Sequence, residues 1–473
     1  MQIGIRNVGP VNRADIYLKN LVVFVGPNNA GKSFVATIMY ASLSQTVVVS
    51  GSRLASTIRR ARPKDSDELD AELAEFLAND TSERIFPPFE SMSNQLKDFF
   101  NEIIKNSFLE YTTSIIDEVR RATGVPLPMI RRIAKKRAVT AVIEIKSASP
   151  SWTITIEIRA GSTSFDIQHP DLADAWQSMN RTTLRRFIRR QGRNRLIPTS
   201  FMLREFSAEL VRACFREVPP HTKYLPAARS GILQSHRALA GSLVRRSTLG
   251  GIEDLRVPAM SGVVADFLSE MIELEESELG AFEEDALSLE DNILHGRIGL
   301  PRSAAPYPEV VYNTATGDFP LGRTSSMVSE LAPVVLYLRH ILGKRDLLLI
   351  EEPEAHLHPA SQIIFAQTLV RLVNHGLRVA LTTHSEFFLQ QINNAIAAGA
   401  INGDKVAKAG VSPENGLQGD MVAAYNFEPT GSGTMVTELS VDTREGISDS
   451  SFGLVSERLY NEAVALDRSA ELE

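Results

Sequence analysis

One cysteine, Cys214, occurs among the 473 residues of this sequence, in a run with helical periodicity. A single thiol cannot form an internal disulfide or a cysteine-rich zinc site, which excludes disulfide-stabilised secreted domains and zinc-finger modules. The sequence also lacks an uncharged apolar window of about 18 residues and a basic N-terminal stretch that leads into an apolar run. We therefore expect a cytoplasmic protein with no membrane association, in which Cys214 is a buried, unreactive thiol.

Low-complexity segments and long heptad repeats are scarce, whereas hydrophobic residues make up 43% of the chain. A sizeable hydrophobic core is therefore expected. Towards the end of the chain, strand and helix patterns alternate, which is typical of an α/β fold with a largely parallel sheet between helices. The expected strands are 346–350 and 377–382, the expected helices are 263–292, 326–342 and 360–374, and a β-hairpin is expected from 141–146 and 153–158.

Charge is distributed unevenly along the chain. The formal net charge is −7, from 50 basic and 57 acidic residues, but residues 119–204 hold 17 basic and 5 acidic residues, a net +12, which leaves −19 for the rest. The stretch 266–291 has 11 carboxylates and no Lys or Arg. The densest basic run follows helical spacing and consists of Arg181, Arg185, Arg186, Arg189, Arg190, Arg193 and Arg195. Three roles fit it: contact with nucleic acid, contact with a protein surface such as the acidic stretch of a second subunit, or exposure to solvent.

A glycine-rich motif near the N-terminus predicts nucleotide binding. It matches Gly-x-x-x-x-Gly-Lys-[Ser/Thr] and lies between an apolar strand at 21–25 and a helical pattern. In such a loop the backbone N–H groups surround a phosphate at a helix N-terminus, Lys32 places a charge beside the β and γ phosphates, and the Ser33 hydroxyl ligates Mg²⁺. The nucleotide-binding residues predicted here are Gly26, Pro27, Asn28, Asn29, Ala30, Gly31, Lys32, Ser33 and Phe34.

Two acidic residues end the apolar strand 346–350, and a histidine follows the next strand. Hydrolysis of a phosphoanhydride needs one carboxylate for the metal and a second that orients or deprotonates the attacking water. We assign these roles to Glu351 and Glu352. His384 follows the strand 377–382, where a neutral imidazole can hydrogen-bond a γ-phosphate. The predicted catalytic residues are therefore Lys32, Glu352 and His384, with ATP and Mg²⁺ as the cofactors.

These motifs, together with Thr324-Ser-Ser-Met-Val-Ser-Glu330, resemble the ATPase heads of the ABC superfamily, in particular the soluble branch that contains RecF, SMC-like and OLD-type ATPases. The resemblance implies an α/β P-loop NTPase head with a mixed sheet. It also implies that Ser325, Ser326 and Glu330 contact, in trans, the nucleotide of a second subunit, so that the active form is a homodimer or a larger homo-oligomer. Residues 354–359 occupy the D-loop position. No clear Q-loop is present, and Arg229 and Gln234 are the candidates for that role.

The resemblance covers residues 1–40 and 220–400, which suggests a discontinuous head. We predict that residues 1–50 and 215–425 form the head, that 51–214 form a largely helical, partly β insertion, and that 426–473 pack on the head.

OLD-type nucleases need an Asp-x-Asp pair in a further metal-nuclease domain, and none follows His384. In size and in the order of its motifs, the chain resembles the ATPase subunit of PARIS-type anti-phage defence systems. This implies a switch that controls a separately encoded effector nuclease, with DNA or a viral protein as trigger. The alternatives are a DNA-repair or DNA-clamping ATPase of the RecF or SMC type and, less well supported by the signature residues, a transporter ATPase subunit.

Overall fold

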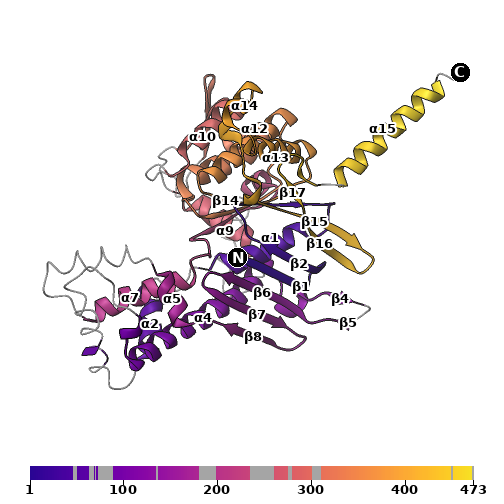
Figure 1. Ribbon diagram of the computed structural model, residues 1–473. Coiled ribbons are helices and arrows are strands. Elements are labelled where there is room, and N and C mark those ends of the chain that lie inside the picture. The colour runs from indigo at the N-terminus through magenta and orange to yellow at the C-terminus, as the bar shows by residue number, and fades with distance from the viewer. Residues whose placement is uncertain are drawn as a thin grey trace, which may run out of the picture.

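The computed structural model describes residues 1–45, 51–62, 69, 71–72, 89–134, 137–179, 199–234, 260–274, 280–300, 310–448 and 451–470. A mixed sheet of 11 strands runs through the molecule (Figure 1). From one edge to the other, its strands are β8 (Thr163–Gln168), β7 (Ser151–Ile158), β6 (Ala141–Ala148), β1 (Gln2–Val8), β2 (Val11–Tyr17), β16 (Gly433–Leu439), β15 (Val422–Thr430), β3 (Leu21–Val25), β14 (Arg378–Thr382), β13 (Leu347–Glu351) and β9 (Thr222–Leu225).

The strands around β3 are parallel, and β3 and β13 are buried at every position. β3 pairs in parallel with β14 and β15, and β13 pairs in parallel with β14 and β9. Alternate side chains of β3 enter different cores: Val22 and Phe24 join one cluster, whereas Leu21, Val23 and Val25 join the other. This is the alternation that a strand covered on both faces requires. The pairings around β1, β6, β7 and β8 are antiparallel, so the sheet as a whole is mixed, which confirms the mixed sheet expected for a P-loop NTPase head.

Helices cover both faces of the parallel region (Figure 1). One core is formed with α1 (Lys32–Leu43), α2 (Gly51–Ala61), α4 (Asn94–Thr123), α5 (Leu172–Ser178) and α7 (Thr199–Cys214). The other is formed with α9 (Gly262–Ile272), α10 (Glu283–Leu289), α11 (Ser326–Leu336), α12 (Pro359–Asn374) and α13 (Glu386–Gly399). The predicted elements at 326–342, 346–350, 360–374 and 377–382 are confirmed by α11 with its continuation 337–341, by β13, by α12 and by β14.

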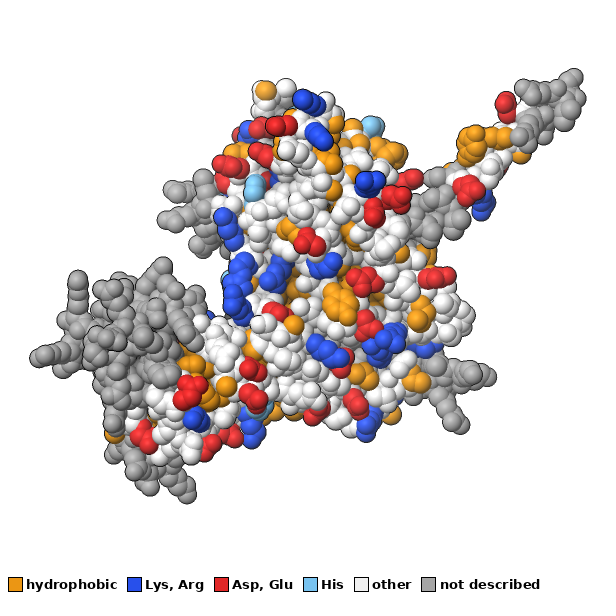
Figure 2. Space-filling model, viewed as in Figure 1, with side chains coloured by type: hydrophobic (Ala, Val, Ile, Leu, Met, Phe, Trp, Pro, Cys, Tyr) orange, Lys and Arg blue, Asp and Glu red, His pale blue; other side chains and the backbone are white. Residues whose placement is uncertain are grey.

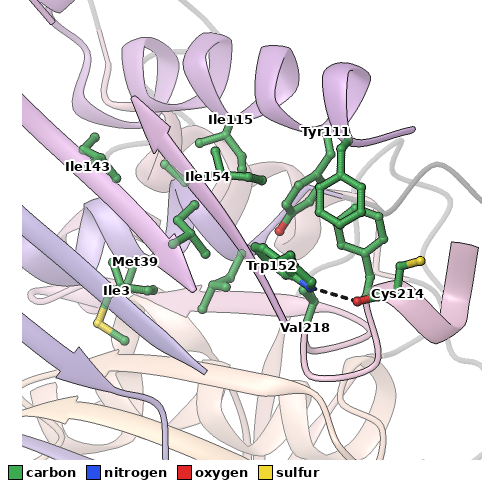
Figure 3. Close-up of a cluster of buried hydrophobic side chains, with 14 of the residues drawn as sticks. Ile3, Met39, Tyr111, Ile115, Ile143, Trp152, Ile154, Cys214 and Val218 are labelled. Carbon is green, nitrogen blue, oxygen red and sulfur yellow. Dashed lines mark hydrogen bonds between the residues drawn. The ribbon is translucent and has the colours of Figure 1, made fainter. Parts of the chain in front are cut away.

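The segment 51–214, predicted as an insertion, shares the sheet and the first core with residues 1–50. The expected β-hairpin is confirmed as β6 and β7, and β6 pairs with β1. Figure 3 shows Tyr111 and Ile115 of α4 packed over these strands, next to Trp152, whose indole N–H donates to the Cys214 carbonyl at 2.9 Å. Burial raises the pKa of the Cys214 thiol to about 12, as expected for an unreactive cysteine.

The continuous helix expected over 263–292 is wrong. Instead, α9 ends at Ile272 and α10 begins at Glu283. Between them the Gly280 N–H donates to the Arg339 carbonyl at 2.7 Å, and a Cβ at Gly280 would lie 2.7 Å from that same oxygen. The chain therefore turns where it meets the continuation of α11, an approach that only glycine permits. Beyond α10 lies a small sheet of β10 (Arg297–Gly299), β11 (Val311–Thr314) and β12 (Gly317–Pro320).

The segment 426–473 was expected to pack on the head, and the structure places its parts differently. β15 crosses the predicted boundary at 425, and β16 lies inside the large sheet between β15 and β2. The last helix, α15 (Ser451–Ala470), projects away from the body (Figure 1, yellow). None of the helices in the described part of the chain is both long and apolar enough to span a membrane.

Candidate nucleotide site

Three loops meet at one edge of the parallel strands. Thr382 of β14 is level with Phe24 of β3 on one side and with Glu351 of β13 on the other. The loops after these strands, which carry residues 26–31, Glu352 and His384, therefore begin side by side. The carboxyl ends of parallel strands form the usual ligand-binding edge of an α/β sheet.

The loop between β3 and α1 has the backbone of a phosphate-binding loop. Gly26, Asn29 and Gly31 have φ values of 135°, 61° and 93°. A Cβ at Gly26 would lie 2.5 Å from the Phe427 carbonyl oxygen, and a Cβ at Gly31 would lie 2.6 Å from Pro10 Cγ. Both glycines are therefore needed for space as well as for conformation. Helix α1 starts at Lys32 without a side-chain cap, so its first N–H groups lack an intrahelical or capping partner and suit an anion.

Lys32 is buried and folds back over this loop. Its Nζ donates to the carbonyls of Gly26 and Pro27 at 2.8 and 2.9 Å, which leaves the third ammonium hydrogen for another acceptor. Burial lowers the pKa of Lys32 to about 8, although the carboxylates of Glu352, Glu354 and Glu351 act in the opposite direction. The neighbouring Ser33 is exposed, as a residue that ligates an incoming Mg²⁺ must be.

The lowered pKa of Lys32 predicts a pH-dependent affinity for ATP. Near pH 8 the nucleotide-free protein begins to lose the ammonium proton, whereas the complex with phosphates needs it, so binding above this pH takes up a proton. The affinity should fall about 8-fold between pH 7.5 and 9. Titration calorimetry in buffers of different ionisation enthalpy measures both the affinity and the proton uptake. Lys32→Arg, which stays charged, should show a flat profile, and a flat profile in the unaltered protein would contradict the prediction.

Glu351, predicted to bind Mg²⁺, is buried and already held by residues 224–227. Tyr224 donates its hydroxyl to Oε1 at 2.7 Å, and the Ala227 N–H donates to Oε2 at 3.0 Å. Each carboxylate oxygen keeps acceptor capacity for a metal-bound water. The carboxylate is thus fixed in orientation by Tyr224 and Ala227, two residues to which the sequence assigned no role. The available signal was their place in the chain: Tyr224 lies in the short apolar strand β9, and Ala227 lies two residues after its end.

Glu352 and His384 face each other across the edge of the sheet. Glu352 has a left-handed φ of 42°, held by hydrogen bonds from its N–H to the carbonyl and hydroxyl oxygens of Thr382 at 3.0 and 3.2 Å. Its side chain is 43% exposed, and Oε1 lies 4.0 Å from His384 Nε2. Burial, and then the charge of Lys32, lower the pKa of His384, so the imidazole is neutral near pH 7 and this contact is not an ion pair. Strain of this kind at a non-glycine residue is typical of functional sites.

A further carboxylate, Glu354, positions His384. The Glu354 Oε1 accepts hydrogen bonds from the His384 N–H at 2.6 Å and from the Thr383 hydroxyl at 2.9 Å, while Oε2 is buried without a partner. Burial raises the pKa of Glu354. The expected D-loop therefore anchors the histidine loop within the same chain. Its two histidines have separate roles: His358 caps α12 by accepting from the Ala360 N–H at 3.2 Å, and His356 adopts a left-handed φ of 62°.

The signature residues, which are those predicted to contact the nucleotide of a second subunit from α11 (the signature helix), form two groups. Ser325 and Ser326 are exposed at the N-terminus of α11, where the Ser325 hydroxyl accepts from the Val328 N–H at 3.4 Å. Glu330, in contrast, is fully buried and bonds within its own chain. Its Oε1 accepts from the N–H and the hydroxyl of Ser230 at 3.1 and 2.7 Å, and its Oε2 pairs with Arg229 Nε at 3.1 Å. In this structure Glu330 is not available to a nucleotide on a second subunit, because no face of its side chain reaches the surface.

Arg229 joins the signature helix to the acidic strand. Its fully buried guanidinium donates to the Glu330 carbonyl at 3.2 Å, to the Pro226 carbonyl at 3.1 Å and to the Glu351 carbonyl at 2.9 Å. Breaking such a buried, paired charge is strongly destabilising, so α11 and the end of β13 are held to one another. Arg229, a candidate Q-loop residue, thus occupies the interior between the two elements. Gln234, the other candidate, is exposed.

The remaining predicted contacts fall elsewhere. The Phe34 ring lies against the β1–β2 turn, where a Cβ at Gly9 would be 2.7 Å from the ring. The arginine run 181–195 lies outside the described residues. Carboxylates of the acidic stretch have partners in their own chain: Glu270 pairs with Lys223 at 2.7 Å, Glu290 with Arg339 at 2.9 Å, and Asp285 with His375 at 2.9 Å. These acids are therefore less available to a basic surface of a second subunit.

The residues around the loop fit ATP with Mg²⁺. The two crowded glycines shape a phosphate cradle, the loop N–H groups and Lys32 supply positive charge, and Ser33 with Glu351 supplies oxygen ligands of the type that Mg²⁺ prefers. Within the described residues, no group of three His, Cys, Asp or Glu side chains is arranged to hold a metal alone.

Comparison with known proteins supports the same class. A family model described as an AAA ATPase domain matches residues 266–389, which include Glu330, Glu351 and His384. No curated protein matches the chain. Together with the phosphate loop, the mixed sheet and the acidic end of β13, this match supports an α/β fold of the P-loop ATPase type.

Similar solved structures are SMC heads. The SMC head domain from Thermotoga maritima is 10% identical, over 93% of this chain and 98% of that chain, with a TM-score of 0.35. The Smc head with an extended coiled coil, bound to the C-terminal domain of ScpA derived from Pyrococcus furiosus, is 10% identical over 93% and 96%, with a TM-score of 0.38. An Smc head bound to the C-winged helix domain of ScpA is 11% identical over 93% and 97%, with a TM-score of 0.41.

Proposed function

We propose that this ATPase is a molecular switch in which ATP closes two copies of the chain onto each other. Each nucleotide is bound by the phosphate loop of one copy, with Lys32 and Ser33, and is covered by Ser325 and Ser326 of the other. Glu352 and His384 then act on the γ-phosphate, and hydrolysis releases the pair. The observation that supports this most directly is the exposed N-terminus of α11, since helix N-termini attract phosphate groups.

Contacts inside the chain would couple α11, at the proposed dimer interface, to the acidic end of β13 in the nucleotide site. Arg229 holds the signature helix to the Glu351 carbonyl, and Tyr224 holds the Glu351 carboxylate. A displacement of α11 on closure would therefore move the acidic end of β13, because buried ion pairs and packed strands do not deform continuously. Glu330 contributes to this coupling from inside the chain.

The output of the switch is, on this proposal, control of a separately encoded effector nuclease in anti-phage defence. The support is the order of the phosphate loop, the acidic strand and His384 along the chain. A gene for a Toprim or HNH nuclease beside the gene for this chain would support the proposal. Neighbouring replication or recombination genes, together with ATP-dependent binding of DNA ends by the protein alone, would favour the DNA-repair alternative.

A Ser326→Glu substitution tests the closed pair. The new carboxylate lies at a helix N-terminus, which stabilises α11, but it would repel the γ-phosphate of the other copy. We expect binding of ATP to single chains to be retained and ATP-dependent dimerisation to weaken by about 100-fold or more. Light scattering in a Glu352→Gln background, where ATP persists, measures the mass of the 52.1 kDa chain against its dimer. Ser326→Ala is the matched control. Equal dimerisation of the Glu and Ala variants would reject the proposal.

A further inference from the structure

The C-terminal helix α15 carries an apolar surface that the body does not cover. Every described side chain from 457 to 467 is exposed except Val464, which is half-buried. Leu459, Tyr460 and Leu466 are 61%, 69% and 67% exposed. Figure 2 shows orange, hydrophobic side chains on this projecting helix. A solitary helix of 20 residues is marginally stable in water, and large apolar side chains exposed together mark an interaction surface.

The spacing of the apolar residues fits a helix as partner. Leu459, Ala463 and Leu466 are separated by four and three positions, which places them on one face, with Ala463 between the two leucines. Because large and small side chains alternate, a second helix can approach closely if one of its leucines packs against Ala463. Because a second copy of α15 offers the same alternation, it can fill the same gaps.

The charges beside this face decide the orientation of such a pair. Arg458 and Glu462 flank the face on one side, and Asp467 flanks it on the other. In a parallel, in-register pair Glu462 would face Asp467 of the other helix, twice, and like charges repel. In an antiparallel pair, the side of one helix that carries Arg458 and Glu462 lies next to the same side of the other helix. With Leu459 opposite Ala463, Glu462 of one helix lies about 3 Å along the axis from both Arg458 and Glu462 of the other. The antiparallel pair therefore has two attractive contacts against one repulsive contact, whereas the parallel pair has two repulsive contacts.

We propose that α15 is a self-association helix that pairs antiparallel with α15 of a second copy, with no requirement for nucleotide. In this arrangement the two bodies attach at opposite ends of a helix pair about 30 Å long. The contact is therefore distinct from the ATP-bridged face at α11. It would join nucleotide-closed pairs into a larger assembly, and its existence does not depend on the proposed switch.

Engineered cysteines test the orientation in the full chain without nucleotide. The native Cys214 is buried and its pKa is raised to about 12, so it does not compete. A tagged Leu459→Cys chain mixed with an untagged Ala463→Cys chain should form a mixed disulfide under mild oxidation. Leu466→Cys alone should not cross-link, because the two positions lie about 15 Å apart in the antiparallel pair, and a disulfide spans at most about 7 Å between Cα atoms. Rapid cross-linking of Leu466→Cys alone, without the mixed disulfide, would overturn the proposal.

Substitution of the apolar face tests the association itself. In Lys32→Ala protein, which removes ATP-driven closure, sedimentation should still detect self-association, and adding Leu459→Glu with Leu466→Glu should weaken it by about 100-fold or more. Asn461→Glu, on the opposite face of α15, is the matched control and should leave it unchanged. A monomeric Lys32→Ala protein at all concentrations would show that another partner occupies the helix, and an equal effect of Asn461→Glu would show general charge repulsion. Either result would overturn the proposal.

Discussion

Replacing Glu352 by glutamine should leave ATP binding intact and lower the rate of hydrolysis by about 100-fold to 10,000-fold, the range expected when a general base is lost. The carboxylate lies at the edge where the loops after β3, β13 and β14 begin side by side, is 43% exposed, and is aimed by a left-handed backbone that its Thr382 contacts maintain. Glutamine preserves the shape and the backbone contacts but cannot accept a proton from the attacking water. Bound ATP should therefore persist.

Single-turnover release of phosphate, combined with equilibrium binding of radiolabelled ATP, separates the two effects. The matched control is the same chemical change one residue earlier, Glu351→Gln. Since Glu351 is buried, oriented by Tyr224 and Ala227, and assigned to Mg²⁺, this variant should mainly lose Mg²⁺-dependent nucleotide affinity. Hydrolysis at the normal rate in the Glu352→Gln protein, or the same defect in both variants, would reject the division of roles between the two acids.

The parts of the site that consist of one short stretch of sequence could be predicted from the sequence alone. The phosphate loop, the strand that ends in Glu351 and the strand before His384 are each coded within ten residues or so, by a run of buried apolar side chains followed by polar ones. The register between these strands is set by the buried faces of the parallel sheet, so a correct local prediction brought the three loops together.

The contacts that orient the site join distant segments, and no local pattern codes them. Tyr224 reaches Glu351 across 127 positions, and Arg229 reaches Glu330 across 101. The sequence placed Glu330 on the signature helix, but it did not show whether the Glu330 side chain faces the core or the surface. Helical periodicity cannot distinguish an acidic residue that faces the core, with a buried arginine as partner, from an acidic residue at the surface. A buried pair of this kind is recognisable only when both partners are placed in space.

The outer strands and the last helix show the same limit. β16 lies between β15 and β2, so the segment 426–439 belongs inside the sheet rather than on it, and this order depends on pairing between the two ends of the chain. Residues 426–473 were predicted to pack on the head, but α15 projects away from it and its apolar side chains are exposed. Periodicity identifies the face that needs a partner, but it does not say whether that partner is the same chain.

Replacing Lys32 by alanine should weaken ATP binding by about 100-fold or more, because a charge-assisted hydrogen bond to each of two phosphates contributes about 1.5–3 kcal/mol. The nucleotide-free fold should not be weakened. In the folded chain burial disfavours the charged form of this lysine and lowers its pKa to about 8. Of its two acceptors, the Pro27 carbonyl lies in an exposed part of the loop, and the Gly26 carbonyl is buried.

Thermal and chemical unfolding with and without Mg-ATP distinguishes this loss of binding from loss of structure. At a nucleotide concentration 100 times its Kd, the unaltered protein should gain about 2.7 kcal/mol of stability, whereas a variant with 100-fold weaker affinity should gain only about 0.4 kcal/mol. Lys19→Ala is the matched control, since it removes another ammonium that donates to a backbone carbonyl, that of Val422 at 2.9 Å. If Mg-ATP stabilised the Lys32→Ala protein as much as the Lys19→Ala protein, the loop between β3 and α1 would not bind the phosphates. If the Lys32→Ala protein were less stable without nucleotide, Lys32 would instead stabilise the loop itself.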